Sequence, residues 1–151
     1  MDICQIDHQK SWNSKKIYQL FQISYRKEAE LIGIEDFPPL RRNTIDIQKS
    51  NSIFYGYYEN NDLLGLVELE IESNRLQICS LVVDPNHFRK GIGSKLIQFG
   101  LETFQYDIST VETALANKPA ILLYEKFGFV ETKVWMTDHK VVKIRLKKIE
   151  Q

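Results

Sequence analysis

A stretch that is apolar almost throughout, LQICSLVV at residues 76–83, leads through a loop containing Gly91 and Gly93 into an amphipathic segment at about 91–104. An apolar run without polar alternation is typical of a strand buried on both faces of a sheet. The amphipathic segment predicts a helix that packs on that sheet through its apolar face. Because glycine disfavours a helix by roughly 1 kcal/mol relative to alanine, two glycines at the helix start indicate a tight turn or a close approach to the backbone.

The rest of the pattern predicts a mixed α/β domain whose sheet is antiparallel early in the chain and gains parallel pairing at the crossover helices. The expected elements are a strand at 2–6, helices at 11–31 and 42–50, strands at 52–59 and 63–72, a strand at 108–113, a helix at 119–127, and a closing hairpin of 129–136 with 140–149. No repeat, linker or low-complexity tract divides the sequence, and we expect a single domain over residues 1–151.

Local signals support these boundaries. Ser11 or Asn13 is the expected cap of the first helix, and Gly33 with the following Pro38–Pro39 pair is expected to end it. The apolar face of that helix is predicted to contain Ile17, Leu20, Phe21, Ser24 and Leu31. In the strand at 63–72, glutamates at 68, 70 and 72 alternate with apolar residues, which is typical of a sheet with one solvated face.

Composition restricts the function classes. The chain has 20 basic and 20 acidic residues and a formal net charge of zero, so no overall field favours nucleic acid or a membrane surface. No signal peptide and no apolar run long enough to span a membrane is visible. The two cysteines, Cys4 and Cys79, lie in apolar alternations and are interpreted as buried, reduced thiols of a cytoplasmic protein. The three histidines are scattered and predict no metal site.

The loop at 89–94 fits an anion-binding site. The first turn of a helix has N–H groups without intrahelical partners and a partial positive charge, and glycine lets an anion reach them. Arg89, Lys90 and Lys95 would add formal charge beside it. The alternative is a plain helix start with glycines in a tight turn. Neither the P-loop pattern nor the dinucleotide fingerprint fits, since Leu96 stands where the fingerprint needs a third glycine.

Two segments then resemble the GNAT superfamily of N-acetyltransferases. The stretch LVVDPNHFRKGIGSKLIQF is similar to its acetyl-CoA-binding segment, Gln/Arg-x-x-Gly-x-Gly/Ala, in which Gly91 and Gly93 match and Phe88 departs from the first position. About 25 residues later, NKPAILLYEKFGF is similar to the segment N-x-x-A-x-x-L/F-Y-x-x-x-G-F. The resemblance implies a central mixed sheet of six to seven strands flanked by about four helices.

It also implies roles for particular residues. Acetyl-CoA would be the co-substrate, with no metal, and its pantetheine would lie between the strands near 79–83 and 107–113. Tyr124 is the implied general acid or coenzyme contact, and Asn117 would orient the cofactor or cap the helix. The implied cofactor-binding residues are Leu81, Val82, Val83, Arg89, Lys90, Gly91, Ile92, Gly93, Ser94, Asn117 and Tyr124.

The acceptor amine needs a base. A lysine-like amine of pKa ~10.4 is neutral in only about one molecule in 2,500 at pH 7. Glu68 is the preferred candidate because it lies nearest the middle of the sheet, with Glu70, Glu72 and Glu112 as alternatives, and water chains as another. The loop at 33–43, through Glu35 and Asp36, and the turn at 137–140 with Trp135 are expected to form the acceptor walls.

The expected activity is therefore direct acetyl transfer, without an acetyl-enzyme, from acetyl-CoA to a primary amine of a small molecule or peptide. Two other readings stay open: a protein N-terminal or lysine acetyltransferase, and a module that senses acetyl-CoA without turnover. No nucleic acid and no membrane partner is expected, and a homodimer is left open. The identity of the acceptor does not follow from the sequence.

Overall fold

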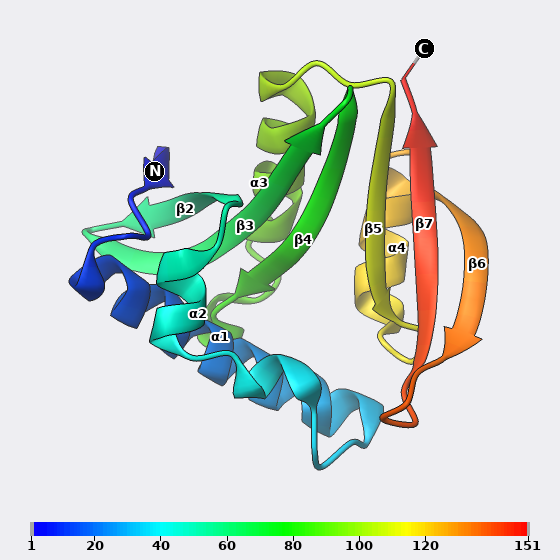
Figure 1. The fold of residues 1–151 in the computed structure, drawn as a ribbon, viewed down its shortest axis with the longest axis horizontal. Helices are drawn as coiled ribbons and strands as arrows, with labels where there is room; N and C mark the ends of the chain where they lie inside the picture. Colours follow the sequence, from blue (N-terminus) through cyan, green and yellow to red (C-terminus); the bar gives the residue numbers. More distant parts are fainter. Residues whose placement is uncertain (1, 151) are drawn as a thin grey trace.

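The computed structural model describes residues 2–150, which form a seven-stranded sheet with helices on both faces (Figure 1). The strands are β1 Asp2–Ile6, β2 Ile53–Glu59, β3 Asp62–Glu72, β4 Arg75–Val83, β5 Ile108–Ala114, β6 Val130–Met136 and β7 Val142–Ile149. The α-helices are α1 Ser11–Ile32, α2 Thr44–Lys49, α3 Ile92–Thr103 and α4 Lys118–Lys126, with short 3-10 helices η1 Pro38–Arg41 and η2 Pro85–His87.

The strand order is β1-β2-β3-β4-β5-β7-β6, and among the described residues only β4 and β5 pair in parallel. This confirms the predicted mixed sheet. One apolar cluster packs α3 and α4 against one face, and a second packs α1 and α2 against the other face of β2, β3 and β4. Both layers meet the sheet at β4, which therefore lies at the centre of the core.

Most of the predicted boundaries are confirmed within a few residues, for visible local reasons. Gly33 ends α1 in the left-handed region at φ +74°, and Asn43 caps α2 in a reciprocal capping box with Asp46. The turn between β2 and β3 places Asn60 and Asn61 at φ +51° and +69°, as a tight hairpin requires.

Three local predictions were wrong. Lys10 occupies the N-cap of α1 without a side-chain bond, while the Asn13 amide donates to the Asp7 carbonyl at 3.0 Å. Leu31 is exposed, because at the end of α1 it borders an open cavity and not the packed core. Cys4 is also exposed, because it lies on the edge strand β1.

The central strand contains a β-bulge. Leu69 of β3 pairs with Ile78 of β4, but the preceding Glu68 pairs with Ser80, so Cys79 is an extra residue. Ile78 consequently packs in the cluster with α3, whereas Val82 packs in the cluster with α1. The apolar run lacks alternation because the strand changes faces at the bulge, and several of its residues are only half-buried.

The parallel ladder between β4 and β5 is short. It pairs Arg75–Ile78 with Ile108–Val111 only, although β4 continues to Val83 and β5 to Ala114. Beyond these pairs the two strands diverge, and α1 passes below the opening in Figure 1. The sheet is therefore open at its centre, at the carboxyl ends of two parallel strands.

Candidate functional site

Two cavities meet where β4 and β5 separate. The strand-gap cavity, of about 510 Å³, is enclosed by α1, η1, β4, β5 and the loop between β6 and β7. The glycine-loop cavity, of about 580 Å³, lies over the start of α3, the end of β4 and one side of α4. They share five lining residues: Glu28, Leu81, Asn117, Ala120 and Tyr124.

The glycine-loop cavity gathers most of the predicted cofactor-binding residues. Its lining includes Leu81, Val83, Arg89, Gly91, Ile92, Gly93, Ser94, Asn117 and Tyr124. Val82 and Lys90 lie outside it. The Val82 side chain is buried on the face of the sheet next to α1, and the exposed Lys90 ammonium lies 3.1 Å from Nδ1 of His87.

The start of α3 differs from those of α2 and α4. Asn43 and Asn117 cap their helices with side-chain oxygens, whereas Gly91, at φ +78°, has no side chain to do so. Arg89 is also in the left-handed region, at φ +66°. Because the first-turn N–H groups of a helix lack intrahelical partners, α3 presents uncovered donors beside the cavity. This geometry suits an anionic group.

Tyr124 lies on α4 at the junction of the two cavities, with 4% of its surface exposed. Its ring packs edge-on against Phe129 at 5.7 Å between centroids. Burial raises the pKa of Tyr124 above its ordinary value of 10.0, so the hydroxyl stays protonated and can donate a hydrogen bond to a group in the junction.

Asn117 starts α4. Its side-chain oxygen accepts the Ala120 N–H at 3.3 Å, so helix capping, one of its two implied roles, is observed. Its amide lies across from the Glu28 carboxylate of α1 and lowers the pKa of that group. Asn117 therefore lies between α1 and the helix that carries Tyr124.

Glu68 does not line either cavity. It is 3% exposed, and both of its carboxylate oxygens accept from the Arg42 guanidinium, at 2.7 and 2.8 Å. The Ser52 and Ser80 hydroxyls donate to it as well. Burial opposes its ionisation, but these hydrogen bonds outweigh burial and lower the pKa of Glu68 below its ordinary value of 4.5. An ion-paired carboxylate of low pKa is a poor proton acceptor, so these contacts favour a structural role over the predicted base.

The solvated face expected for β3 begins only after Glu68. Glu70 and Glu72 are exposed, because α2 and η1 cover the sheet no further than Glu68. Among the four predicted carboxylates, Glu112 alone lines the strand-gap cavity, and its Oε2 accepts two hydrogen bonds from Arg145 at 2.7 and 2.9 Å.

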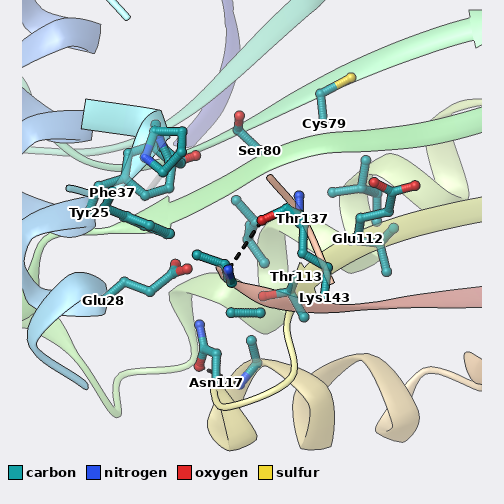
Figure 2. Close-up of a pocket in the computed structure, with 18 of the residues that line it drawn as sticks. Tyr25, Glu28, Phe37, Cys79, Ser80, Glu112, Thr113, Asn117, Thr137 and Lys143 are labelled. Atoms are coloured by element: carbon teal, nitrogen blue, oxygen red, sulfur yellow. Dashed lines mark hydrogen bonds between the residues drawn. The ribbon is translucent and has the colours of Figure 1, made fainter. Parts of the chain in front are cut away.

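Glu28 is a site residue that the sequence analysis missed. It belongs to the stripe of α1 that contains Phe21 and Ser24, and a carboxylate on an apolar stripe is the signal that could have found it. Burial raises the pKa of Glu28 to about 7, partly offset by the Lys143 ammonium and by the polar Asn117 amide. Figure 2 shows Glu28 pointing from α1 into the strand-gap cavity, with Asn117 and Thr137 across from it.

The predicted wall segments contribute different residues from those expected. The loop at 33–43 lines the cavity with Phe37, Pro38 and Pro39, while Asp36 forms an exposed ion pair with Arg41. On the opposite side, the lining consists of Thr137, His139, Val141 and Lys143. Trp135 lies outside it, with the Lys133 ammonium and the Arg145 guanidinium over its ring.

Within residues 2–150, no cluster of three or more His, Cys, Asp or Glu side chains is suitably arranged for a metal ion. None of the helices described there has the length and apolar character to cross a membrane.

Comparisons with known proteins agree with the resemblance. Residues 14–129 match the profile of the Acetyltransferase (GNAT) family. UPF0157 protein YqkA of Bacillus subtilis is 38% identical over 126 residues, which cover 82% of this chain and 36% of that protein. N-alpha-acetyltransferase 30 of Xenopus laevis is 26% identical over 132 residues, covering 74% of this chain and 46% of that protein. The chain thus spans about a third to a half of the length of these relatives.

The fold has close structural counterparts. The PaiA N-acetyltransferase from Thermoplasma acidophilum, solved in complex with coenzyme A, superposes with a TM-score of 0.72 over 99% of this chain and 100% of that one. The two sequences are 17% identical, so this likeness concerns the fold. It confirms the predicted arrangement of a central mixed sheet between helices.

Proposed function

The chain belongs to the Acetyltransferase (GNAT) family, and on that premise we propose that it transfers the acetyl group of acetyl-CoA to a primary amine. The observation that supports this most directly is that the two cavities meet at Tyr124. The glycine-loop cavity lies beside the first-turn N–H groups of α3, and the strand-gap cavity leaves room for a second reactant. Two reactants that enter from opposite sides can react directly, without an acetyl-enzyme.

In this proposal coenzyme A occupies the glycine-loop cavity. Its diphosphate would contact the N–H groups between Arg89 and Ser94. Its pantetheine would pair, as an added strand does, with the backbone of Leu81 to Val83, which pairs with β3 but not with β5. The thioester would then lie at the shared junction, next to Leu81 and Tyr124.

The proposed chemistry is mainly positional. A backbone N–H of β4 would stabilise the oxyanion of the tetrahedral intermediate, a contact commonly worth ~3 kcal/mol. The Tyr124 hydroxyl would donate its proton to the departing coenzyme A sulfur, a step for which we propose no metal.

The acceptor would enter through the strand-gap cavity, between η1 and the β6–β7 loop. We propose a small-molecule or peptide amine. The similarity to N-alpha-acetyltransferase 30 favours the amino terminus of a peptide as a specific second candidate. A cytoplasmic location and a homodimer stay predictions.

Thiol release tests the proposal. Purified protein with acetyl-CoA and a panel of amines, polyamines and peptides with unblocked amino termini should release coenzyme A thiol with at least one acceptor. Binding of acetyl-CoA in calorimetry without release from any acceptor would instead support a sensor of the cofactor.

Replacement of Tyr124 by phenylalanine should lower kcat about 100-fold, because loss of a positioned proton donor commonly costs 10²–10⁴ in rate. The affinity for acetyl-CoA should stay within about twofold, since the ring and its packing are retained. Tyr106→Phe is the matched control, because Tyr106 is also buried but lies outside both cavities. Equal kcat values for the two variants would contradict a role for the Tyr124 hydroxyl.

A further inference from the structure

We propose that Glu28 accepts the proton that the acceptor ammonium must lose before it attacks the thioester. This inference rests on the proposed acetyl transfer and assigns its general base to a helix that carries none of the predicted candidates. The carboxylates considered from the sequence lie on β3 and β5, whereas Glu28 lies on α1.

Position is the first argument. Glu28 lines both cavities, and it shares that property with Tyr124, the proposed acid. The acetyl group and the acceptor nitrogen must meet where the cavities meet. A base at this junction can reach the acceptor nitrogen, and a proton donor on α4 can reach the coenzyme A sulfur. One residue would therefore remove the proton from nitrogen, and a different residue would protonate the sulfur.

The second argument concerns the groups that surround the carboxylate. The Asn117 amide lies across from Glu28, and the Asn117 side-chain oxygen is fixed by the Ala120 N–H at 3.3 Å. Within residues 2–150, no ion pair shorter than 4.0 Å is found for Glu28. The proton-accepting capacity of the carboxylate is therefore not consumed by a guanidinium.

The charged and titratable groups around Glu28 come from several elements. Tyr25 lies one turn earlier on α1, Tyr124 is on α4, and Lys143 faces it from β7, while His139 of the β6–β7 loop lines the same cavity. Burial outweighs the attraction of Lys143 and raises the pKa of Glu28 to about 7. A base with this pKa is half ionised at neutral pH, and it binds a proton far more readily than an ordinary carboxylate.

The other buried carboxylates are less suited. The Glu68 oxygens accept hydrogen bonds from Arg42 and from the hydroxyls of Ser50, Ser52 and Ser80, and Glu68 itself lines neither cavity. Glu112 lines the strand-gap cavity alone, away from the junction, and Arg145 holds its Oε2 through two hydrogen bonds. Each has a guanidinium that stabilises its anion, which Glu28 lacks.

The proton balance is as follows. The acceptor ammonium gives one proton to the Glu28 carboxylate, and the resulting neutral amine attacks the thioester carbon. The carbon–nitrogen bond forms and the carbon–sulfur bond breaks, with the Tyr124 proton passing to sulfur. The second nitrogen proton restores the Tyr124 hydroxyl, and Glu28 releases its proton to solvent. Ammonium and acetyl-CoA thus give amide, coenzyme A thiol and one proton.

The experiment measures kcat/KM against pH for the wild type and for Glu28→Gln, with the best acceptor of the amine panel. We expect the wild-type profile to rise through a limb near pH 7. Glu28→Gln should lower kcat at least about 100-fold and lose that limb, while acetyl-CoA affinity changes less than about threefold. Glu28→Asp should recover part of the rate together with the limb.

Two further variants distinguish the alternatives. Glu30→Gln, on the same helix but exposed and outside both cavities, should keep the wild-type profile. Glu112→Gln should retain the limb near pH 7. If Glu112→Gln loses the limb and Glu28→Gln keeps it, the assignment to Glu28 is wrong.

A measurement independent of turnover checks the raised pKa. Because the carboxyl titrates near 7 in the folded chain and near 4.5 when unfolded, wild-type stability from this group is complete below pH 4.5 and is lost as pH rises through 7. The melting temperature of Glu28→Gln relative to wild type should therefore increase between pH 5 and pH 8.5. An unchanged difference would contradict the raised pKa of the Glu28 carboxyl. If the wild type acetylates no amine, the proposed acetyl transfer is wrong, and the assignment of Glu28 as its base is wrong with it, whatever the melting temperatures show.

Discussion

Gly91→Val should weaken coenzyme A binding at least about 100-fold, which corresponds to about 2.7 kcal/mol of binding free energy. Gly91 is the N-cap of α3, and a Cβ built on it meets no described atom within 4 Å. The added side chain would therefore occupy open space over the N–H groups proposed to hold the diphosphate. Isothermal calorimetry with coenzyme A measures the effect directly.

Gly33→Val provides a closely matched control. Gly33 has φ +74° against +78° for Gly91, and a Cβ there also meets nothing within 4 Å. Both substitutions should cost a similar folding free energy, of order 1–2 kcal/mol, for a left-handed residue with a side chain. Only Gly91 borders the cavity. Equal coenzyme A affinities in the two variants would contradict the proposed diphosphate site.

Glu68→Gln should lower the free energy of unfolding by about 3 kcal/mol, at the lower end of the range for breaking a buried ion pair. The change leaves the Arg42 guanidinium without its anion, over the rings of Phe21 and Phe54, at 5.5 and 5.8 Å from their centroids. We expect a loss at the lower end of this range because the Arg42 side chain is 27% exposed, so water can partly solvate its unpaired charge. Urea unfolding at pH 7 gives the difference.

Asp36→Asn is the control for this prediction, because it breaks the exposed pair with Arg41 and should cost less than about 1 kcal/mol. Acid strengthens the test. The folded-state pKa of Glu68 is depressed, so its contribution is present above the ordinary value of 4.5 and is lost as pH falls through the folded value. The stability gap between wild type and Glu68→Gln should close in that range. A large loss of kcat in Glu68→Gln that is still folded would restore Glu68 as a base candidate.

The sequence predicted the elements well where local chemistry determines them. The Asn43 capping signal, the asparagine turn at 60 and 61, and the glycines at 33 and 91 each act within a few residues, so no tertiary information is needed to interpret them. The glycine loop also led to the family, because its function depends on backbone groups and not on a distant partner.

The bulge at Cys79 could not be predicted in this way. An apolar strand that changes faces and one buried on both faces have the same hydrophobic pattern, and only the pairing with β3 distinguishes them. Glu68 shows the same limit. Its alternation with Val67 and Leu69 indicated a solvated face, but Arg42, 26 residues earlier, folds over that position and neutralises it.

Glu28 was missed for a related reason. A helix stripe marks the side that faces the rest of the protein, but it does not say whether a residue meets a packed core or a cavity. Near Phe21 the stripe of α1 packs in the core, whereas one to two turns later it borders the opening between β4 and β5. The difference arises from strands that are about 50 residues or more away in the sequence.

The four-residue ladder between β4 and β5 has a thermodynamic consequence. The two parts of the sheet, β1–β4 and β5–β7, share few backbone hydrogen bonds. A ligand that lies between them would contact both parts, and it would therefore bind only the assembled sheet. Coenzyme occupancy and folding then become one linked equilibrium, worth about 2.7 kcal/mol when the ligand concentration is 100 times Kd. The opening proposed as the reaction site is thus also the point at which a bound cofactor would stabilise the whole sheet.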